Sequence, residues 1–273
     1  MIPADPNAPE LRVSELLDAC IEIAEQAGER ILTVYGTDFD VETKDDNSPL
    51  TRADTESHRC IMAGLQALEE QLPVLSEEGR EIDFATRSSW SRYWLVDPLD
   101  GTKEFIKRNG EFTVNIALID NHRPVLGVVH APVLGVTYAG DANGAIRIEN
   151  GKREAMRTRT KSDPPTLVVS RSHQDEALQQ LLAGIGEHEA ASRGSSLKFC
   201  LVADGSADLY PRTGPTSEWD TAAGHAVVLA AGGSVVRIDD WEALEYNRKD
   251  SVLNPGFAVI GDPGYDWRGA LAI

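Results

Sequence analysis

Two aspartates three positions apart mark the stretch of this sequence that is best suited to chemistry. Asp97 and Asp100 flank Pro98 and Leu99 directly after the apolar run of residues 93–96, which predicts a buried strand. The ring of Pro98 fixes its backbone φ and stiffens the turn. The two carboxylates and the Leu99 carbonyl are oxygen ligands of the kind that Mg²⁺ prefers. The stretch therefore indicates a Mg²⁺ site at the end of a strand.

The residues after the aspartates suit an anion. Gly101 can adopt a positive φ and has no side chain to keep a ligand away. Thr102 begins a predicted helix whose free N–H groups favour a phosphate, which would also bridge the metal. The alternative interpretation is structural, with Asp100 as a helix N-cap and Asp97 as a solvated strand-end residue.

Three more carboxylates stand at the ends of predicted elements. Glu77 follows the short strand of residues 73–76, where it could reach into a cleft, whereas Glu78 is taken as solvated. Asp220 lies at the start of an otherwise apolar helix, where it could serve a metal or only cap the helix. Asp54 lies in the first turn of another helix, a position that the helix dipole alone would favour.

Several other chemistries are disfavoured by spacing. The six histidines show no metal-ligand spacing, and the three cysteines are scattered singly at positions 20, 60 and 200. Such cysteines fit reduced thiols better than a disulfide framework or a zinc site. Ser170–His173 and Gly194–Ser196 contain serines, but neither has the spacing of a nucleophile elbow.

Composition limits the class of partner. The chain has 273 residues, 41% of them hydrophobic, and 26 basic against 44 acidic residues give a net charge of −18. Such a field repels nucleic acid polymers and anionic membranes, yet a small anion can bind where cations reverse the sign locally. No apolar stretch could span a bilayer, and the first residues lack the features of a secretory signal. We therefore expect a cytoplasmic protein, with loose membrane association left open.

Hydrophobic periodicity predicts the elements that must position these residues. The first part of the chain favours one antiparallel sheet with two long helices. It predicts helices at residues 9–35 and 51–72, strands at 39–43, 73–76, 93–96, 112–118 and 125–138, a surface excursion at 82–90 and hairpin-like material at 143–159.

The pattern changes after the polar segment of residues 160–165. Strands and helices now alternate, which predicts a partly parallel sheet with helices packed on it. The strands are expected at residues 167–170, 207–210, 234–238 and 258–260, and the helices at 175–184, 197–203 and 220–231. We therefore expect two layered α/β units, residues 1–160 with most metal ligands and residues 161–273 with Asp220 and the residues of substrate specificity.

In combination, these motifs resemble the inositol monophosphatase-like superfamily of metal-dependent phosphatases. The chain contains, in order, a Glu-Glu pair after a strand, the turn Asp-Pro-x-Asp-Gly-Thr and the helix start Trp-Asp-x-Ala-Ala-Gly. Residues 74–78, 100–112, 170–173 and 194–200 further resemble the bacterial 3′(2′),5′-bisphosphate nucleotidases of the CysQ type. The resemblance implies the alternating αβαβα sandwich that the superfamily shares with fructose bisphosphatases.

The resemblance also implies roles for individual residues. Two or three Mg²⁺ ions, with Mn²⁺ as an alternative, would be held by Glu77, Asp97, Asp100, Asp220 and the Leu99 carbonyl. Glu77 and a pair formed by Thr102 and Asp54 would help to activate the attacking water. Backbone N–H groups of Gly101 and Thr102 would hold the phosphate, and Li⁺ would inhibit by taking the metal position beside the leaving group.

A nucleoside bisphosphate also needs a cationic pocket for its second phosphate. The candidates are His173, Lys198 and Arg212, with Ser195 and Ser196 as further donors and the metal ligands Glu77, Leu99, Asp100 and Asp220 also in contact with substrate. Lys198 and Arg212 could instead be ordinary solvated cations.

The substrate prediction depends on one departure from the inositol-specific enzymes. Those members place an acidic residue ahead of Trp-Asp, whereas this chain has Arg212 and Thr213 in that region, with Glu218 nearer the motif. We therefore predict removal of the 3′-phosphate from 3′-phosphoadenosine 5′-phosphate to give AMP, with 3′-phosphoadenylyl sulfate as a further candidate substrate in sulfur assimilation. The alternatives are an inositol monophosphatase-type sugar phosphatase and a non-catalytic module that binds phosphate or a metal. The oligomeric state is left open.

Overall fold

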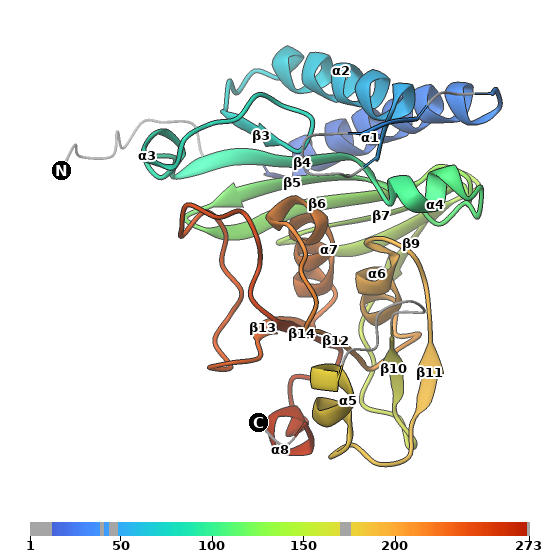
Figure 1. Cartoon of the computed structure of the whole chain (residues 1–273), viewed down its shortest axis with the longest axis vertical. Helices are drawn as coiled ribbons and strands as arrows, with labels where there is room; N and C mark the ends of the chain where they lie inside the picture. Colours follow the sequence, from blue (N-terminus) through green and yellow to red (C-terminus); the bar gives the residue numbers. More distant parts are fainter. Residues whose placement is uncertain (1–12, 39–40, 44–48, 170–175, 272–273) are drawn as a thin grey trace.

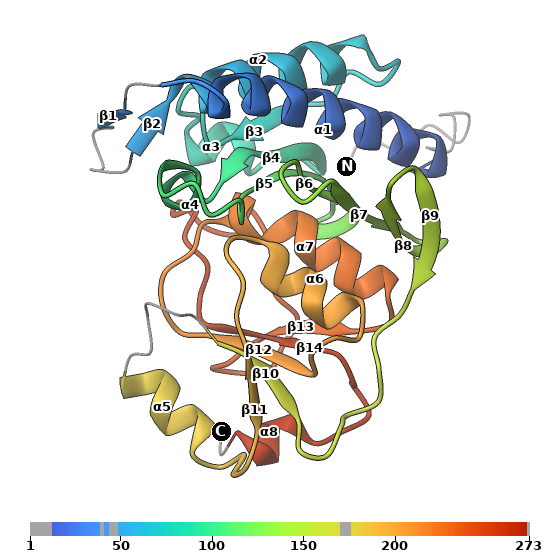
Figure 2. The ribbon, with the colours of Figure 1, turned by 90° about the vertical axis from the view of Figure 1, so that its right-hand side faces the viewer.

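Layers of helix and sheet alternate through the molecule. The computed structural model describes residues 13–38, 41–43, 49–169 and 176–271. Helices α1 (Val13–Tyr35) and α2 (Arg52–Ala67) cover the outer face of a seven-stranded sheet (Figures 1 and 2). Helices α6 (Leu197–Ala203) and α7 (Glu218–Ala230) lie between this sheet and a five-stranded sheet. Helices α5 (Glu176–Leu182) and α8 (Trp267–Ala270) form the last layer. The predicted αβαβα sandwich is confirmed.

The larger sheet carries the strand on which the central motif lies. Its order follows the chain from β3 to β9, with β3 and β4 parallel and every other pair antiparallel. The strands are β3 (Val74–Ser76), β4 (Arg92–Asp100), β5 (Thr113–Asp120), β6 (Arg123–Ala131), β7 (Val136–Asp141), β8 (Gly144–Glu149) and β9 (Lys152–Met156). The antiparallel strands and the hairpin predicted from alternation are confirmed. A small separate hairpin joins β1 (Val41–Thr43) to β2 (Pro49–Thr51).

Small residues bring α7 directly onto the inner face of this sheet. A Cβ atom added to Gly127 on β6 would lie 2.3 Å from the carbonyl oxygen of Ala223 on α7. One added to Gly140 on β7 would lie 2.6 Å from Cβ of Ala230. Side chains at these glycines would therefore force the helix away from the sheet. This close approach brings the first turn of α7, and Asp220 with it, to the sheet that contains Asp97.

Several boundaries differ from the predictions, and the predicted strand of residues 125–138 is divided into β6 and β7. Helix α2 ends at Ala67 rather than near residue 72, because Leu68 adopts an extended conformation with ψ 150°. The predicted surface excursion contains α3 (Phe84–Arg87), and Arg87 on it is buried. Strand β4 continues through Asp97 to Asp100 rather than ending at residue 96.

The five-stranded sheet has the order β11-β10-β12-β14-β13. It consists of β10 (Thr166–Val168), β11 (Glu189–Ala191), β12 (Leu209–Arg212), β13 (Ser234–Arg237) and β14 (Phe257–Ile260). Strand β10 pairs in parallel with β11 and β12, whereas β14 pairs antiparallel with β12 and β13. The partly parallel sheet is confirmed, although β11 and α8 were not anticipated. The division at residue 160 stays a prediction, because α7 of the second unit packs on the sheet of the first.

Asp208 makes hydrogen bonds to residues 159–166, the segment that connects the larger sheet to the smaller one. Its fully buried carboxylate accepts hydrogen bonds from Arg159 Nε at 3.0 Å, Arg159 Nη2 at 2.8 Å and the backbone N–H of Thr166 at 2.7 Å. Burial alone would raise the pKa of Asp208, but these bonds, with two more from Ser162, lower it to about 2. The folded protein therefore favours the ionised form of this carboxylate.

We expect Asp208→Asn to lower the free energy of unfolding by roughly 2–3 kcal/mol near neutral pH, because hydrogen bonds to a charged group are lost. Because the folded-state pKa is depressed, the stabilisation is present above the ordinary aspartate pKa and is lost as pH falls through about 2. Urea unfolding of parent and variant should therefore show a gap that narrows between pH 5 and pH 3. A gap of equal size at both pH values would contradict this assignment.

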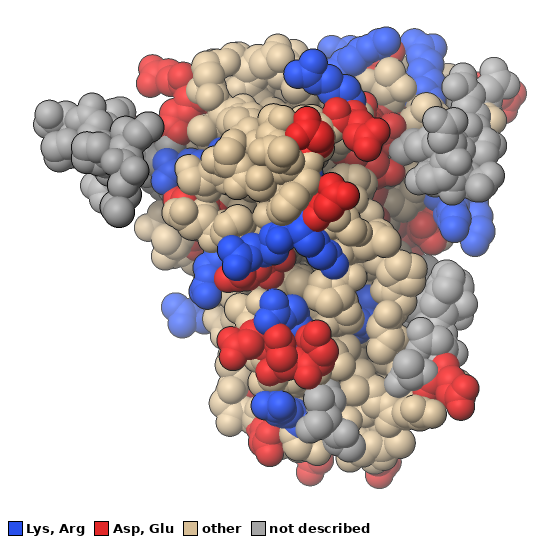
Figure 3. Space-filling model, turned by 60° about the vertical axis from the view of Figure 1, so that its left-hand side comes forward, with Lys and Arg blue, Asp and Glu red and all other residues tan. Residues whose placement is uncertain are grey.

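The surface charge is mixed in sign on the face drawn in Figure 3. There, basic side chains form a band with acidic side chains above and below it. The net charge of −18 therefore does not give this face one sign. Among the described residues, no helix combines the length and the apolar character needed to cross a membrane.

Candidate active site

The central motif lies where β4 meets α4 (Thr102–Ile106). The pairing of β4 with β5 shifts register between Asp97 and Asp100, so the strand is irregular at the motif. Asp97 is only 1% exposed, and its Oδ1 accepts a hydrogen bond from the backbone N–H of Leu99 at 3.0 Å. The N-cap of α4 is Gly101, with φ 93°. Both structural alternatives, a solvated Asp97 and an N-capping Asp100, are therefore wrong.

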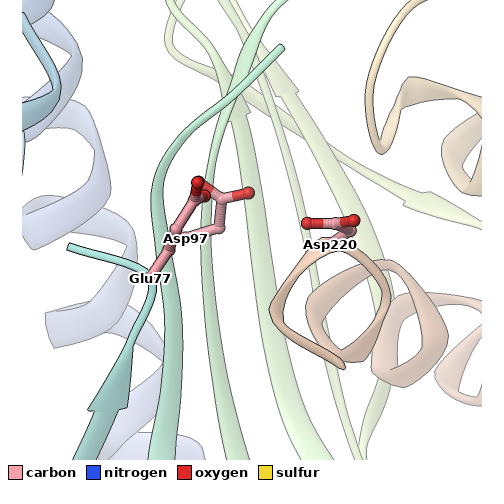
Figure 4. Close-up of side chains that lie close together, drawn as sticks. All are labelled: Glu77, Asp97 and Asp220. Carbon is pink, nitrogen blue, oxygen red and sulfur yellow. The ribbon is translucent and has the colours of Figure 1, made fainter. Parts of the chain in front are cut away.

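Three carboxylates from separate elements converge beside this turn. Glu77 directly follows β3, Asp97 lies on β4, and Asp220 lies in the first turn of α7. Each offers one oxygen within 4.8 Å of the others, and Figure 4 shows the three side chains around a common space. Asp220 is not the N-cap of its helix. That residue is Ser217, whose backbone N–H donates to Asp220 Oδ2 at 2.8 Å.

The electrostatics of the cluster favour a bound cation. Burial raises the pKa of Asp97 well above its usual value, and the charges of Glu77, Asp100 and Asp220 raise it further. Burial also raises the pKa of Asp220, with Asp100 as the next cause. Carboxylates held this close are destabilised when ionised unless a cation offsets their charge. The oxygen donor set and its repulsion thus fit a hard divalent metal.

Asp100 lies beside this group but outside it. All hydrogen bonds to its carboxylate from the described residues reach Oδ2, where the backbone N–H and Oγ of Ser196 each lie at 2.7 Å. Asn115 Nδ2 and Thr113 Oγ1 lie at 3.3 Å and 3.5 Å from the same oxygen. The arrangement leaves Oδ1 as the oxygen with which Asp100 could bind a cation.

Thr102 and Asp54, predicted as a pair, lie in contact. The Thr102 hydroxyl donates to Asp54 Oδ1 at 3.2 Å, although Thr102 is 48 positions away in sequence. Asp54 Oδ2 accepts the backbone N–H and the hydroxyl of Thr51, each at 2.7 Å. The bond from the Thr51 N–H is part of the capping box of α2, and both bonds hold the buried Asp54 carboxylate in place. The second oxygen of Asp54 is thereby directed to Thr102.

A cleft of about 440 Å³ lies beside the carboxylate cluster, and of the three carboxylates it is lined by Asp220. Five basic side chains line it from both units of the chain, against the carboxylates of Asp100, Glu104 and Asp220, so its lining has a small positive excess in an acidic protein. The basic residues are Lys103, Lys107, Arg193, Lys198 and Arg212, and the predicted residues Asp100, Gly101, Ser195 and Asp220 also line the cleft. Such a cleft suits a small anion with more than one negative charge.

Two of the three cations that we predicted from sequence, Lys198 and Arg212, line this cleft and are half-buried. Lys198 Nζ donates to the Ser195 carbonyl at 2.8 Å, and burial lowers the pKa of its ammonium group. Arg212 Nε donates to the Gly214 carbonyl at 3.2 Å. His173 lies outside the described residues. Ser196 does not line the cleft and is 1% exposed.

Glu218 is turned away from the cleft. Its carboxylate is 2% exposed and accepts the backbone N–H of Asn247 at 2.9 and 3.0 Å. Burial raises the pKa of Glu218 to about 7, although the Asn247 bonds oppose the change. Asn247 in turn accepts a hydrogen bond from the buried Arg87 at 2.5 Å. Through Asn247, Glu218 therefore holds the loop at residue 247 and helix α3 against the start of α7. Its carboxylate does not face a ligand in the cleft.

Sequence reasoning missed three cations that line the cleft. Lys103 on α4 and Lys107 directly after it are exposed and lie four positions apart. Arg193 comes from the second predicted unit of the chain, beyond residue 160. The spacing of the two lysines, immediately after the turn at Gly101, was a signal that could have found them. Nothing local to Arg193 indicates that it reaches the same cleft.

Comparisons with known proteins agree with this geometry. The profile of the inositol monophosphatase family matches residues 12–258, and the chain belongs to that family. Members of the family depend on metal ions, which the acidic cluster fits.

The chain is also similar to individual members. It is 54% identical over 248 residues to the 3′(2′),5′-bisphosphate nucleotidase CysQ of Escherichia coli strain K12, covering 89% of this chain and 99% of that protein. It shares 44% identity and a TM-score of 0.82 with the crystal structure of CysQ from Bacteroides thetaiotaomicron, covering 92% and 99% of the two chains. Inositol monophosphatase from Anabaena, at 22% identity, 96% coverage of both chains and TM-score 0.73, shares the fold.

Proposed function

We propose that this chain is a metal-dependent 3′(2′),5′-bisphosphate nucleotidase that removes the 3′-phosphate of 3′-phosphoadenosine 5′-phosphate to give AMP. One observation carries the proposal. Three carboxylates meet, and one of them, Asp220, lines a cleft with five basic side chains, in a chain 54% identical to a nucleotidase of that name. A metal site beside a cationic cleft suits a small substrate with two phosphates.

The proposed metal ligands are Glu77, Asp97, Asp220, Asp100 through Oδ1, and the Leu99 carbonyl, and the proposed ion is Mg²⁺. Hard oxygen donors of this kind suit Mg²⁺, with Mn²⁺ as a substitute. When bound, such ions supply a water of lowered pKa and stabilise charge on the departing oxygen.

The Thr102–Asp54 pair would accept the proton of the attacking water. Because the Thr102 hydroxyl proton points to Asp54 Oδ1, its oxygen lone pairs remain available to the attacking water. As the water oxygen attacks phosphorus, its proton passes to Thr102 while the threonine proton passes to Asp54. The bond from phosphorus to the ribose 3′ oxygen breaks with its electron pair on that oxygen, which then takes a proton from solvent to give the 3′-hydroxyl of AMP. Asp54 is buried and fixed by Thr51, so it needs no rearrangement to act.

The cleft walls would recognise the rest of the substrate. Lys198 and Arg212, with Ser195, would lie against the nucleotide, while the exposed Lys103 and Lys107 would approach the second phosphate. Glu218, the acidic residue nearest the Trp-Asp motif, is buried against Asn247. It is therefore not available to hold a sugar hydroxyl, which disfavours an inositol phosphate as the main substrate.

The cellular setting proposed is the cytoplasm. All three cysteines are free; Cys20 and Cys200 are buried and Cys60 is partly buried. Unpaired thiols of this kind are typical of a reducing compartment.

The function is tested by phosphate release from 3′-phosphoadenosine 5′-phosphate and inositol 1-phosphate, side by side with Mg²⁺. We expect the bisphosphate to have the higher kcat/KM, with AMP as product. A preference for inositol 1-phosphate would favour a sugar phosphatase. Binding without phosphate release from either compound would favour a non-catalytic module.

In the same assay, Lys103→Ala combined with Lys107→Ala should raise KM for the bisphosphate on the order of tenfold, because two cations near the second phosphate are removed. Hydrolysis of adenosine 3′-monophosphate, which lacks that phosphate, should be almost unchanged. The difference in KM between this variant and the parent should shrink at high salt, which screens exposed charges. Lys152→Ala combined with Lys249→Ala removes the same charge elsewhere and serves as the control. Equal losses on both substrates would refute this subsite.

A further inference from the structure

Ser196 joins the two parts of the chain that bring carboxylates to the metal cluster. It is the N-cap of α6, where a serine hydroxyl ordinarily accepts a backbone N–H of its own helix. Here the hydroxyl makes no such capping bond. Ser196 is 1% exposed and does not line the cleft. Its hydroxyl is therefore used neither for its helix nor for contact with solvent.

The polar atoms of Ser196 lie between Asp100 and Asp220. Its backbone N–H donates to Asp100 Oδ2 at 2.7 Å. Its Oγ lies 2.7 Å from the same oxygen and 2.7 Å from the carbonyl oxygen of Asp220. Asn115 Nδ2 donates to Ser196 Oγ at 2.8 Å and so fixes the orientation of the hydroxyl. The single hydroxyl proton thus has two acceptors at the same distance, the Asp100 carboxylate and the Asp220 carbonyl, so it bridges the two residues.

The preceding residue fastens the same loop to the metal-binding turn. Ser195 has φ 50°, and its Oγ donates to the Asp100 carbonyl at 2.8 Å. A Cβ atom added to Gly101 would lie 2.1 Å from Ser195 Oγ, so only glycine allows this approach. The loop before α6 is thus docked against the turn of β4 at both the backbone and the carboxylate of Asp100.

We propose that Ser196 is a positioning residue that couples Asp100 on the larger sheet to Asp220 on α7. Holding Oδ2 of Asp100 presents Oδ1 to a cation, while the bond to the α7 backbone sets the distance to the Asp220 carboxylate. Mutation of residues that orient metal ligands in this way typically lowers the affinity of the site for its metal. The inference rests on the metal-dependent function proposed above, and it assigns Ser196 a role other than the substrate contact expected from sequence.

The test is Mn²⁺ binding to metal-free protein, measured by calorimetry and by electron paramagnetic resonance without substrate. We expect Ser196→Ala to weaken Mn²⁺ binding about 10- to 100-fold, the usual cost of losing a residue that orients a ligand. With saturating metal, kcat should fall while KM for the bisphosphate changes little. Ser206→Ala removes a serine hydroxyl outside the site, in the same unit, and should bind Mn²⁺ as the parent does.

A second variant guards against misfolding of the first. Asn115→Ala removes the donor that orients the Ser196 hydroxyl and should weaken Mn²⁺ binding in the same direction but to a smaller extent. Parent-like Mn²⁺ affinity in folded Ser196→Ala would overturn the proposal, and a raised KM alongside it would make Ser196 a substrate contact. If the parent fails to hydrolyse bisphosphates, the nucleotidase proposal fails, while the Mn²⁺ comparison still decides the role of Ser196.

Discussion

Asp97→Asn is expected to lower kcat at least 100-fold while the protein stays folded. The change removes a negative charge from the cluster of Glu77, Asp97 and Asp220. Losing a residue that only orients a metal ligand typically lowers activity roughly 10- to 100-fold, and losing a ligand itself should lower it more. The fold should tolerate the change, because asparagine keeps the oxygen that accepts the Leu99 N–H. Steady-state phosphate release with Mg²⁺ measures the loss.

Unfolding temperatures with and without Mg²⁺ provide the second measurement for this variant. A metal that binds only the folded parent should raise its unfolding temperature, and Asp97→Asn should lose most of that increase. Without metal the variant should be at least as stable as the parent, because burial and then the charges of its acidic neighbours raise the pKa of Asp97 in the parent. Asp141→Asn, a buried aspartate of the same sheet outside the cluster, is the control. Normal turnover in Asp97→Asn would refute the metal assignment.

Thr102→Val should lower kcat by about 10²- to 10⁴-fold, the range for losing a positioned proton acceptor. Valine keeps the shape of threonine but removes the hydroxyl that donates to Asp54. KM should change little, because the interaction is made mainly in the transition state. Asp54→Asn should show a similar loss, since the amide cannot accept the proton that Thr102 passes on.

The pair can be separated from general disruption by a double-mutant cycle. If Thr102 and Asp54 act as one unit, the double variant should be hardly slower than either single variant. Thr102→Ser retains the hydroxyl and should keep much of the activity, and Thr158→Val serves as the control outside the cleft. A raised KM with unchanged kcat in Thr102→Val would mean that the pair only positions the substrate.

Local pattern alone determined the turn and most of the elements around it. Alternation in residues 112–118 and the helical spacing before Tyr35 depend only on which side of a strand or helix is buried. Pro98 and Gly101 act on their own backbone angles, so the turn at the end of β4 could also be predicted. The family resemblance added the roles of Thr102 and Asp54, and the structure brings the two side chains into contact.

Tertiary packing decided which charged groups share a site. A periodic pattern tells that a face is buried but not what it packs against, so the approach of α7 to Gly127 and Gly140 could not be predicted. That approach brings Asp220 to Asp97 across 123 positions of sequence, and it points Glu218 toward Asn247 instead of the cleft. The hydroxyl of Ser196 likewise has its partners in three other elements, β4, β5 and α7. Its role depends on how separate surfaces meet, which no stretch of sequence encodes by itself.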